Sequence, residues 1–343
     1  MATVGILGAS GYTGVELLRL CAGHPDLEVV FATGDSQAGV ELAELYPSLA
    51  AHYGARRFEA WSPELLDGVD GLFVALPHGA SQELMGDVLD SGVKVVDLGA
   101  DFRLPDPSEY ERWYGEPHAR SDLLDRFAYG LTELYRDEIV ASHAVANPGC
   151  YPSAANLALA PLVRAGVIDP ATIVVNAVSG ASGAGRGPKA STTFCAVDED
   201  VTAYGLLTHR HSAEIEMVLG APALFTPHLV PMNRGILATC TASPGTQARE
   251  RPLSTESLLE LLAQFYEAEP FVVVSERPPS TKATLGSNSV HLTARFDERT
   301  GTVLAMGALD NLVKGASGAA VQNMNLLLGL PEQAGLSVVG VYP

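Results

Sequence analysis

The chain has 343 residues, of which 47% are hydrophobic and 18% are charged, so wholesale disorder is excluded and two domains fit better than one. Its net charge of −19 argues against a nucleic-acid or anionic-membrane partner, and no apolar run approaches the ~20 residues of a membrane span. The N-terminal residues do not have the pattern of a signal peptide, and the four cysteines form no CxxC pair, so we expect a reduced cytoplasmic protein without a metal site.

The first half of the chain alternates between strand patterns and helix patterns. Strands are predicted at 3–7, 28–32, 71–76, 93–98 and 139–146, with helices at 13–21 and 81–90. This alternation predicts a parallel sheet with right-handed crossovers. The last of these strands runs directly into the segment Asn147-Pro148-Gly149-Cys150.

The second half has a different texture. Helices are predicted at 154–165, 254–268 and 311–328, and strands at 172–178, 236–242, 289–296 and 302–308. Residues 297–301 are polar with one glycine, which predicts a hairpin between the last two strands. We therefore expect a mixed or antiparallel sheet with helices on one face.

A glycine-rich turn, Gly8 to Gly14 (GASGYTG), follows the first strand and opens the first helix. Glycines allow a tight turn and close approach of the backbone to a pyrophosphate, which the helix N-terminus favours. Because the strand-turn-helix context is present, dinucleotide binding is favoured over a purely structural turn. The choice of dinucleotide stays open, since Asp35 suits the ribose hydroxyls of NAD whereas Ser36 and Thr33 could bind a 2′-phosphate.

Cys150 lies just after a predicted strand and just before a predicted helix. A thiol at a helix N-terminus is stabilised as the nucleophilic thiolate, and this interpretation is favoured over a buried cysteine in a turn. The remaining cysteines lie in apolar or mixed runs and are expected to be inert: Cys21, Cys195 and Cys240.

The triplet His209-Arg210-His211 begins a predicted helix and is a dense positive cluster in an acidic chain. We assign acid/base chemistry to His211 and anion binding to His209 and Arg210, against the alternative of a solvated helix start. His228 is expected to be structural.

Further cationic or glycine-rich segments indicate an anionic substrate. The loop from Ser179 to Arg186 can wrap a phosphate through its backbone N–H groups, although a flexible linker is the alternative. Arg103 follows the fourth predicted strand, at the sheet edge where ligands bind in open α/β folds. A dinucleotide with a Cys/His pair implies hydride transfer to or from a carbon bound to sulfur, and the anion-binding residues favour phosphate as nucleophile or leaving group.

Nine motifs in order along the whole chain together resemble the N-acetyl-γ-glutamyl-phosphate reductase family of arginine biosynthesis. They are GASGYTG (8–14), PHGAS (77–81), LGADFRL (98–104), YGLTEL (129–134), NPGCYPSA (147–154), SGASGAGR (179–186), HRHSAEIE (209–216), FTPHLVPMNRGI (225–236) and DNLVKGASGAAVQNMN (310–325).

The resemblance implies an α/β protein similar to glyceraldehyde-3-phosphate dehydrogenase. Residues 1–149 with 312–343 form the Rossmann-type NADP-binding domain, and residues 150–311 form an α+β catalytic and oligomerisation domain. A homodimer or homotetramer is expected, which acts on a small-molecule acyl phosphate through a thioester.

The resemblance also assigns site residues. Cys150 is the expected nucleophile and His211 the acid/base. The expected cofactor residues are Gly8, Ser10, Gly11, Tyr12, Thr13, Gly14, Ser36, Pro77, Gly183 and Asn311. The expected substrate or phosphate residues are Arg103, Asn147, Ser182, Arg186 and His209. Ser153 replaces the usual threonine, and Asp35 stands where many members carry a basic or neutral residue.

Four alternatives remain at this stage. A lysine-pathway homologue acts on an aminoadipyl phosphate linked to an acidic carrier protein, which a chain of −19 would repel. An enzyme similar to aspartate-semialdehyde dehydrogenase is a second. A redox sensor with a reactive thiol is a third, and it would not release phosphate. A cysteine hydrolase leaves GASGYTG unexplained.

Overall fold

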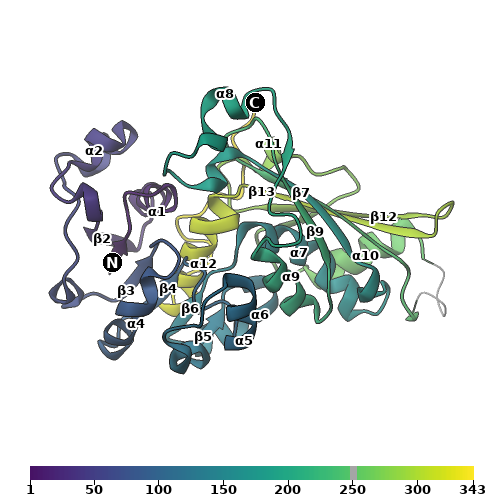
Figure 1. The fold of residues 1–343 in the computed structure, drawn as a ribbon, viewed down its shortest axis with the longest axis horizontal. Coiled ribbons are helices and arrows are strands. Elements are labelled where there is room, and N and C mark those ends of the chain that lie inside the picture. Colours follow the sequence, from purple (N-terminus) through teal and green to yellow (C-terminus); the bar gives the residue numbers. More distant parts are fainter. Residues whose placement is uncertain (248–252) are drawn as a thin grey trace. The chain divides into compact units, whose positions relative to one another are not determined.

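The computed structural model describes residues 1–247 and 253–343, and the chain divides into two compact units (Figure 1). The first unit comprises Met1–Pro148 and Ala316–Leu336. The second unit comprises Gly149–Gly315 and Ser337–Pro343. In the part of the chain that the structure describes, none of the helices combines the length and hydropathy needed to cross a bilayer.

The first unit is built on a six-stranded sheet in the order β2-β1-β3-β4-β6-β5, and every neighbouring pair is parallel. The strands are β1 (Ala2–Leu7), β2 (Leu27–Ala32), β3 (Gly71–Val74), β4 (Lys94–Asp97), β5 (Phe127–Tyr129) and β6 (Ala144–Ala146). The chain moves outward from β1 to β2 and then returns to place β3 on the other side of β1. The carboxyl ends of β1 and β3 therefore form the topological switch point at which such sheets bind ligands.

The helices of this unit are α1 (Tyr12–Ala22), α4 (Ala80–Asp90), α5 (Pro107–Tyr114), α6 (Thr132–Ala141) and α12 (Gly318–Leu327), with short helices α2 (Leu42–Leu45) and α3 (Ala50–Tyr53). The sequence sets their ends locally. In α5, the Asp106 side chain accepts from the Ser108 N–H, Pro107 occupies the first turn, and Gly115 ends the helix at φ +80°. The core between sheet and helices contains Leu72, Val74, Met85, Val88 and Val95.

The second unit is built on a seven-stranded mixed sheet in the order β11-β12-β13-β10-β7-β9-β8. The strands are β7 (Val174–Ser179), β8 (Thr202–Ala203), β9 (Leu224–Leu229), β10 (Ile236–Ala242), β11 (Val272–Val274), β12 (Val290–Asp297) and β13 (Thr302–Leu309). The pairs β7–β9 and β11–β12 are parallel, and the other pairs are antiparallel. The predicted hairpin between β12 and β13 is confirmed.

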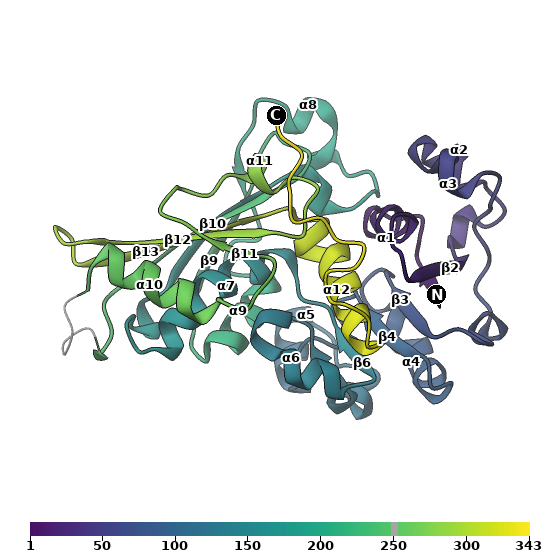
Figure 2. The ribbon, with the colours of Figure 1, turned by 180° about the vertical axis from the view of Figure 1, so that it is seen from behind.

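The helices of this unit are α7 (Cys150–Arg164), α8 (Phe194–Val197), α9 (His211–Leu219), α10 (Thr255–Phe265) and α11 (Thr281–Thr284). Helices α7 and α10 pack against the sheet, and α9 packs against α7 (Figures 1 and 2). Alternate residues of β10 are buried, from Ile236 to Ala242. Helix α7 is buried almost all round, so it is the central helix of the unit and its first turn is held in a fixed place.

The predicted combination of a parallel sheet with a mixed sheet is confirmed, but several elements differ in extent. The strand predicted at 139–146 is wrong in its first part, because α6 continues through Ala141 with Ile139 fully buried and only Ala144–Ala146 form β6. The helix predicted at 154–165 begins earlier, at Cys150. Strand β9 was not predicted, because Pro227 interrupts its pattern; the strand lies beside the two-residue edge strand β8, where a proline is tolerated.

The end of the chain also differs from the expectation. The helix predicted at 311–328 is a π-helical turn, Val313–Ser317, followed by α12. The Asp310 side chain accepts from the backbone N–H groups of Leu312 and Val313, which delays the start of the regular helix. The terminal residues 337–343 belong to the second unit, not to the expected range of 312–343. Backbone bonds from Asn288 to Ser337 (2.8 Å) and from Val341 to Leu285 (2.7 Å) attach them there.

Candidate active site

The glycine-rich turn of the first unit has the shape that a pyrophosphate needs. Gly8 has φ +75°, and a Cβ there would lie 2.4 Å from the Ala75 carbonyl oxygen. A Cβ on Gly14 would lie 2.4 Å from the Ala9 Cα, so this position also requires glycine. Gly11 is the N-cap of α1, and no side chain caps the helix. The first turn of α1 therefore has no side-chain cap and can receive a ligand at the N-terminus, where Ser10, Tyr12 and Thr13 lie.

The end of β2 carries the residues expected to select the dinucleotide. The Thr33 hydroxyl accepts from the Gly8 N–H at 3.2 Å and its side chain is buried, so it supports the turn. Asp35 and Ser36 are both exposed in the turn Asp35–Gln37. This is the position of the adenosine ribose in folds of this type. The contact between Gly8 and Ala75 also brings the loop that contains Pro77 to the same edge of the sheet.

Cys150 is the first residue of α7, and Gly149 is its N-cap. The backbone N–H and the hydroxyl of Ser153 both donate to the Gly149 carbonyl oxygen at 3.0 Å, which stabilises the first turn. Cys150 is partly exposed, whereas burial raises the pKa values of Cys21 and Cys240 to about 12. The helix N-terminus stabilises a thiolate at Cys150, so this is the cysteine suited to nucleophilic chemistry.

His211 and Glu214 lie against the peptide that precedes Cys150. Glu214 Oε2 accepts from the Gly149 N–H at 2.8 Å, and Glu214 Oε1 lies 4.0 Å from His211 Nε2. A Cβ on Gly149 would lie 2.5 Å from His211 Nε2 and 2.9 Å from Glu214 Oε1, so only glycine fits between these groups. The second unit therefore brings Cys150, His211 and Glu214 together.

The sequence interpretation missed Glu214. Its side chain is only 1% exposed, and it stands three residues after His211 on the same face of α9. A glutamate in that position of a helical HRHSAEIE segment is a signal that could have been used. A buried carboxylate next to a histidine orients the imidazole and stabilises its charged form.

His209 is not suited to the cationic role expected for it. Burial, followed by the charge of Arg210, lowers its pKa to about 4, so the ring is neutral at pH 7. Its Nδ1 accepts from the His211 N–H at 3.2 Å, and its ring packs edge-on against Tyr151 and Phe225. A neutral imidazole can still donate one hydrogen bond to a substrate oxygen.

In the loop after β7, Ser182, which is expected to bind phosphate, and Gly183, which is expected to bind the cofactor, lie against Asn311, a second expected cofactor residue. The Asn311 amide donates to the Ser182 hydroxyl at 3.0 Å and accepts from the Gly235 N–H at 2.7 Å. Gly183 lies against the same amide, since a Cβ there would be 3.8 Å from Asn311 Nδ2. Arg186 is exposed further along this loop.

The two remaining phosphate candidates belong to the first unit. The Asn147 amide is engaged within that unit, because it donates to the Ala316 carbonyl oxygen at 3.1 Å and accepts from Asn323 at 3.2 Å. Arg103 is buried and donates to the Leu98 carbonyl oxygen at 3.0 Å. Within residues 1–247 and 253–343, no group of three or more His, Cys, Asp or Glu side chains is arranged to hold a metal ion.

Comparison with known proteins finds a sequence-profile match in each half of the chain. Residues 3–142 match the sequence profile of the semialdehyde dehydrogenase NAD binding domain, and residues 150–311 match that of the semialdehyde dehydrogenase dimerisation domain. Among solved structures, the fold resembles aspartate semialdehyde dehydrogenase II from Vibrio cholerae, with a TM-score of 0.70 at 15% identity over 96% of this chain and 98% of that one. Aspartate semialdehyde dehydrogenase from Candida albicans gives a TM-score of 0.67 at 14% identity, over 96% of this chain and 98% of that one.

Relatives of known name are similar over their full length. The N-acetyl-γ-glutamyl-phosphate reductase of Symbiobacterium thermophilum is 49% identical over 99% of each chain. The reductases of the same name from Desulforudis audaxviator and Pseudomonas aeruginosa are 47% and 43% identical over 100% of each chain. The chain therefore belongs to the N-acetyl-γ-glutamyl-phosphate reductase family of the semialdehyde dehydrogenases.

Proposed function

We propose that the protein reduces N-acetyl-L-glutamyl 5-phosphate to N-acetyl-L-glutamate 5-semialdehyde, with release of phosphate, in arginine biosynthesis. The observation that carries the proposal is the arrangement of Cys150, His211 and Glu214 at the start of α7. A thiol with an adjacent acid/base is what a thioester mechanism requires. The full-length relatives named for this reaction support the choice of substrate.

The Cys150 thiolate attacks the acyl carbon, and the bond between that carbon and the phosphate oxygen breaks. Phosphate leaves with its electron pair, and a thioester remains on Cys150. After reduction of the thioester carbon, the oxyanion of the thiohemiacetal takes a proton from His211, and the carbon–sulfur bond then breaks as the proton returns to His211. The aldehyde is released and the thiolate is restored. Glu214 holds both the Gly149 peptide and the His211 ring, so it positions the acid/base relative to the nucleophile.

The glycine-rich turn fits a nicotinamide dinucleotide, which supplies the hydride when bound. We assign its pyrophosphate to the backbone from Gly8 to Thr13, where the close packing of Gly8 and Gly14 leaves no room for side chains. Ser36 and the loop at Pro77 are assigned to the ribose and nicotinamide parts, and Gly183 and Asn311 to the nicotinamide end. NADPH is the proposed form, with the Ser36 hydroxyl donating to the 2′-phosphate. Release of substrate phosphate is assigned to Arg103, Arg186 and Ser182, with His209 as a neutral donor.

The protein is proposed to act as a homo-oligomer in the cytoplasm. Helices α7 and α10 cover one face of the second sheet, toward which Val175 and Ala177 of β7 are buried. The alternate residues Val174, Asn176 and Val178 point to the opposite face and are less buried. A second copy packed on that face buries them, in keeping with the dimerisation-domain profile. Size-exclusion chromatography with light scattering should therefore give a dimer or tetramer and no monomer.

Activity is tested in the direction of aldehyde oxidation. Purified protein with N-acetylglutamate semialdehyde, inorganic phosphate and NADP⁺ should form NADPH only when phosphate is present. NAD⁺ should be used less well, and aspartate semialdehyde should be a poor substrate. Reduction of cofactor that does not depend on phosphate would contradict the proposal, and a preference for aspartate semialdehyde would change the substrate.

A further inference from the structure

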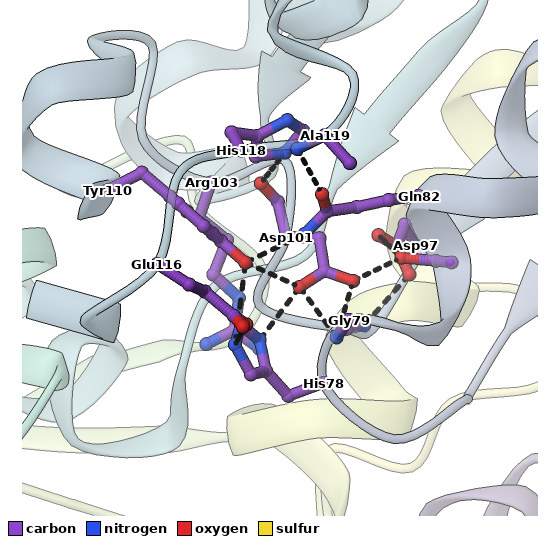
Figure 3. A network of polar contacts seen from close by, with 12 residues as sticks. His78, Gly79, Gln82, Asp97, Asp101, Arg103, Tyr110, Glu116, His118 and Ala119 are labelled. Carbon is purple, nitrogen blue, oxygen red and sulfur yellow. Dashed lines mark hydrogen bonds and ion pairs between the residues drawn. The ribbon is translucent and has the colours of Figure 1, made fainter.

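A second cluster of polar side chains in the first unit takes no part in the mechanism above. It contains His78, Asp101 and Glu116 (Figure 3), and Tyr114 stacks on His78. His78 stands in the loop after β3, and Asp101 in the loop after β4. Tyr114 is the last residue of α5, and Glu116 stands two residues later. Because β3 and β4 are parallel neighbours, both loops emerge at the carboxyl edge of the sheet, where this fold binds ligands.

Asp101 organises the loop that carries His78. Its fully buried carboxylate accepts from the Gly79 N–H at 2.9 and 3.0 Å and from the Ser81 hydroxyl at 2.7 Å. Its Oδ1 also lies 2.7 Å from His78 Nδ1, within ion-pair distance. One buried carboxylate therefore fixes the backbone after β3 and lies against one nitrogen of the imidazole, in an ion-pair contact that lacks hydrogen-bond geometry.

The His78 ring is held on its face as well as at its edge. It stacks on Tyr114 with the ring centroids 4.5 Å apart, and Tyr114 stacks on Tyr110 at the same distance. The side chain nevertheless remains 24% exposed. A partly exposed side chain held in this way loses little conformational entropy when it binds a ligand.

The second nitrogen of His78 faces an acid that can move away. His78 Nε2 lies 3.5 Å from Glu116 Oε1 and 3.4 Å from the Tyr110 hydroxyl. The Glu116 side chain is 60% exposed. Charge-assisted N–H···O bonds are typically about 2.7–2.9 Å long, so the contact with Glu116 is a loose one that a better-placed anion can replace. Arg103, held to the Leu98 carbonyl oxygen of the same loop as Asp101, adds positive charge to this edge.

We propose that His78, protonated on both ring nitrogens, binds a phosphate group through Nε2–H, and that the Glu116 carboxylate occupies this place in the free protein. Asp101 and Tyr114 are positioning residues that hold the imidazole for this contact. The inference rests on the proposed function, because that function supplies the two possible sources of the phosphate. They are the dinucleotide and the acyl phosphate substrate.

The test uses direct binding to the full-length protein, without turnover. The dissociation constants of NADPH, from its fluorescence, and of inorganic phosphate, from calorimetry, are measured for wild type, His78→Gln and Glu116→Gln. Loss of one charge-assisted hydrogen bond should weaken the binding of one probe in His78→Gln about tenfold. Removal of the competing carboxylate in Glu116→Gln should tighten the same probe about two- to fivefold. A purely structural role for Glu116 predicts no tightening.

Glu111→Gln is the matched control, because Glu111 is an exposed acid of α5 outside the cluster and the charge change is identical. Its affinity for both probes should equal that of the wild type. If NADPH is the affected probe, the contact is with the dinucleotide; if phosphate is affected, the contact is with the leaving group. Unchanged affinity of His78→Gln for both probes overturns the proposal, as does a Glu116→Gln variant that binds neither probe more tightly than Glu111→Gln. A wild type that binds both probes but does not oxidise the semialdehyde would refute the proposed function instead.

Discussion

Replacing Glu214 with glutamine tests whether a buried carboxylate makes His211 effective. The substitution keeps an oxygen that can accept from the Gly149 N–H but removes the negative charge 4.0 Å from His211 Nε2. Two charges at that distance interact by about 4 kcal/mol at an effective dielectric constant of about 20. The His211 side chain is 19% exposed, so solvent screens part of this attraction, and about 1.4–2.8 kcal/mol is the safer guide. We therefore expect kcat/KM to fall about 10- to 100-fold, since about 1.4 kcal/mol corresponds to a factor of ten.

The assay is the initial rate of NADPH formation from N-acetylglutamate semialdehyde and phosphate, together with urea unfolding of each variant. Glu214→Gln should keep a free energy of unfolding within about 1 kcal/mol of the wild type, because the Gly149 N–H keeps an acceptor. Glu214→Ala should lose about 1–3 kcal/mol, because that N–H is left unpaired. Glu216→Gln, on the same helix and two residues away, is the control and should retain activity. A Glu214→Gln enzyme with wild-type kcat/KM would refute the positioning role.

Two further predictions follow from the cysteines and from a buried acid. At pH 7, iodoacetamide should label Cys150 ahead of Cys195, although Cys195 is the more exposed; equal rates in peptide mass spectra would show that exposure rather than the helix N-terminus decides reactivity. Burial, then the charge of Asp101, raises the pKa of Asp97 to about 7, so the folded state keeps a proton that the unfolded state has lost above about pH 4. This stability is present at low pH and is lost as the pH rises through 7, so the wild type should lose about 2–3 kcal/mol relative to Asp97→Asn between pH 5 and pH 8. If the free energies of unfolding of the two proteins change with pH in the same way over this range, the raised pKa of Asp97 is contradicted.

Much of the architecture follows from local patterns in the sequence. Strand β10 has the predicted bounds, Ile236–Ala242, because its alternate residues face α7 and its neighbours are clear turn residues. The glycine-rich turn was also predictable, since Gly8 and Gly14 stand where the backbone leaves no room for a Cβ. In both cases, short-range sequence determines the local conformation.

Other features depend on contacts between residues far apart in the chain. The run 139–146 is too short to reveal whether a helix or a strand buries Ile139, and the fold decides in favour of the end of α6. The neutral state of His209 arises from burial that no local pattern reports. Glu214 contacts the Gly149 peptide only because the fold places α9 beside it, although the two residues are 65 positions apart in the sequence. The polar cluster at His78 and Asp101 likewise needs two separate loops to meet.

The central claim is that Cys150 carries the acyl group. The most direct test compares phosphate-dependent NADP⁺ reduction with N-acetylglutamate semialdehyde by the wild type, Cys150→Ser and the control Cys195→Ser. Wild type and Cys195→Ser should turn over at similar rates, while Cys150→Ser should retain less than about one part in a thousand, because a serine hydroxyl is not ionised at neutral pH. Turnover by Cys150→Ser near the wild-type rate would contradict the thioester mechanism.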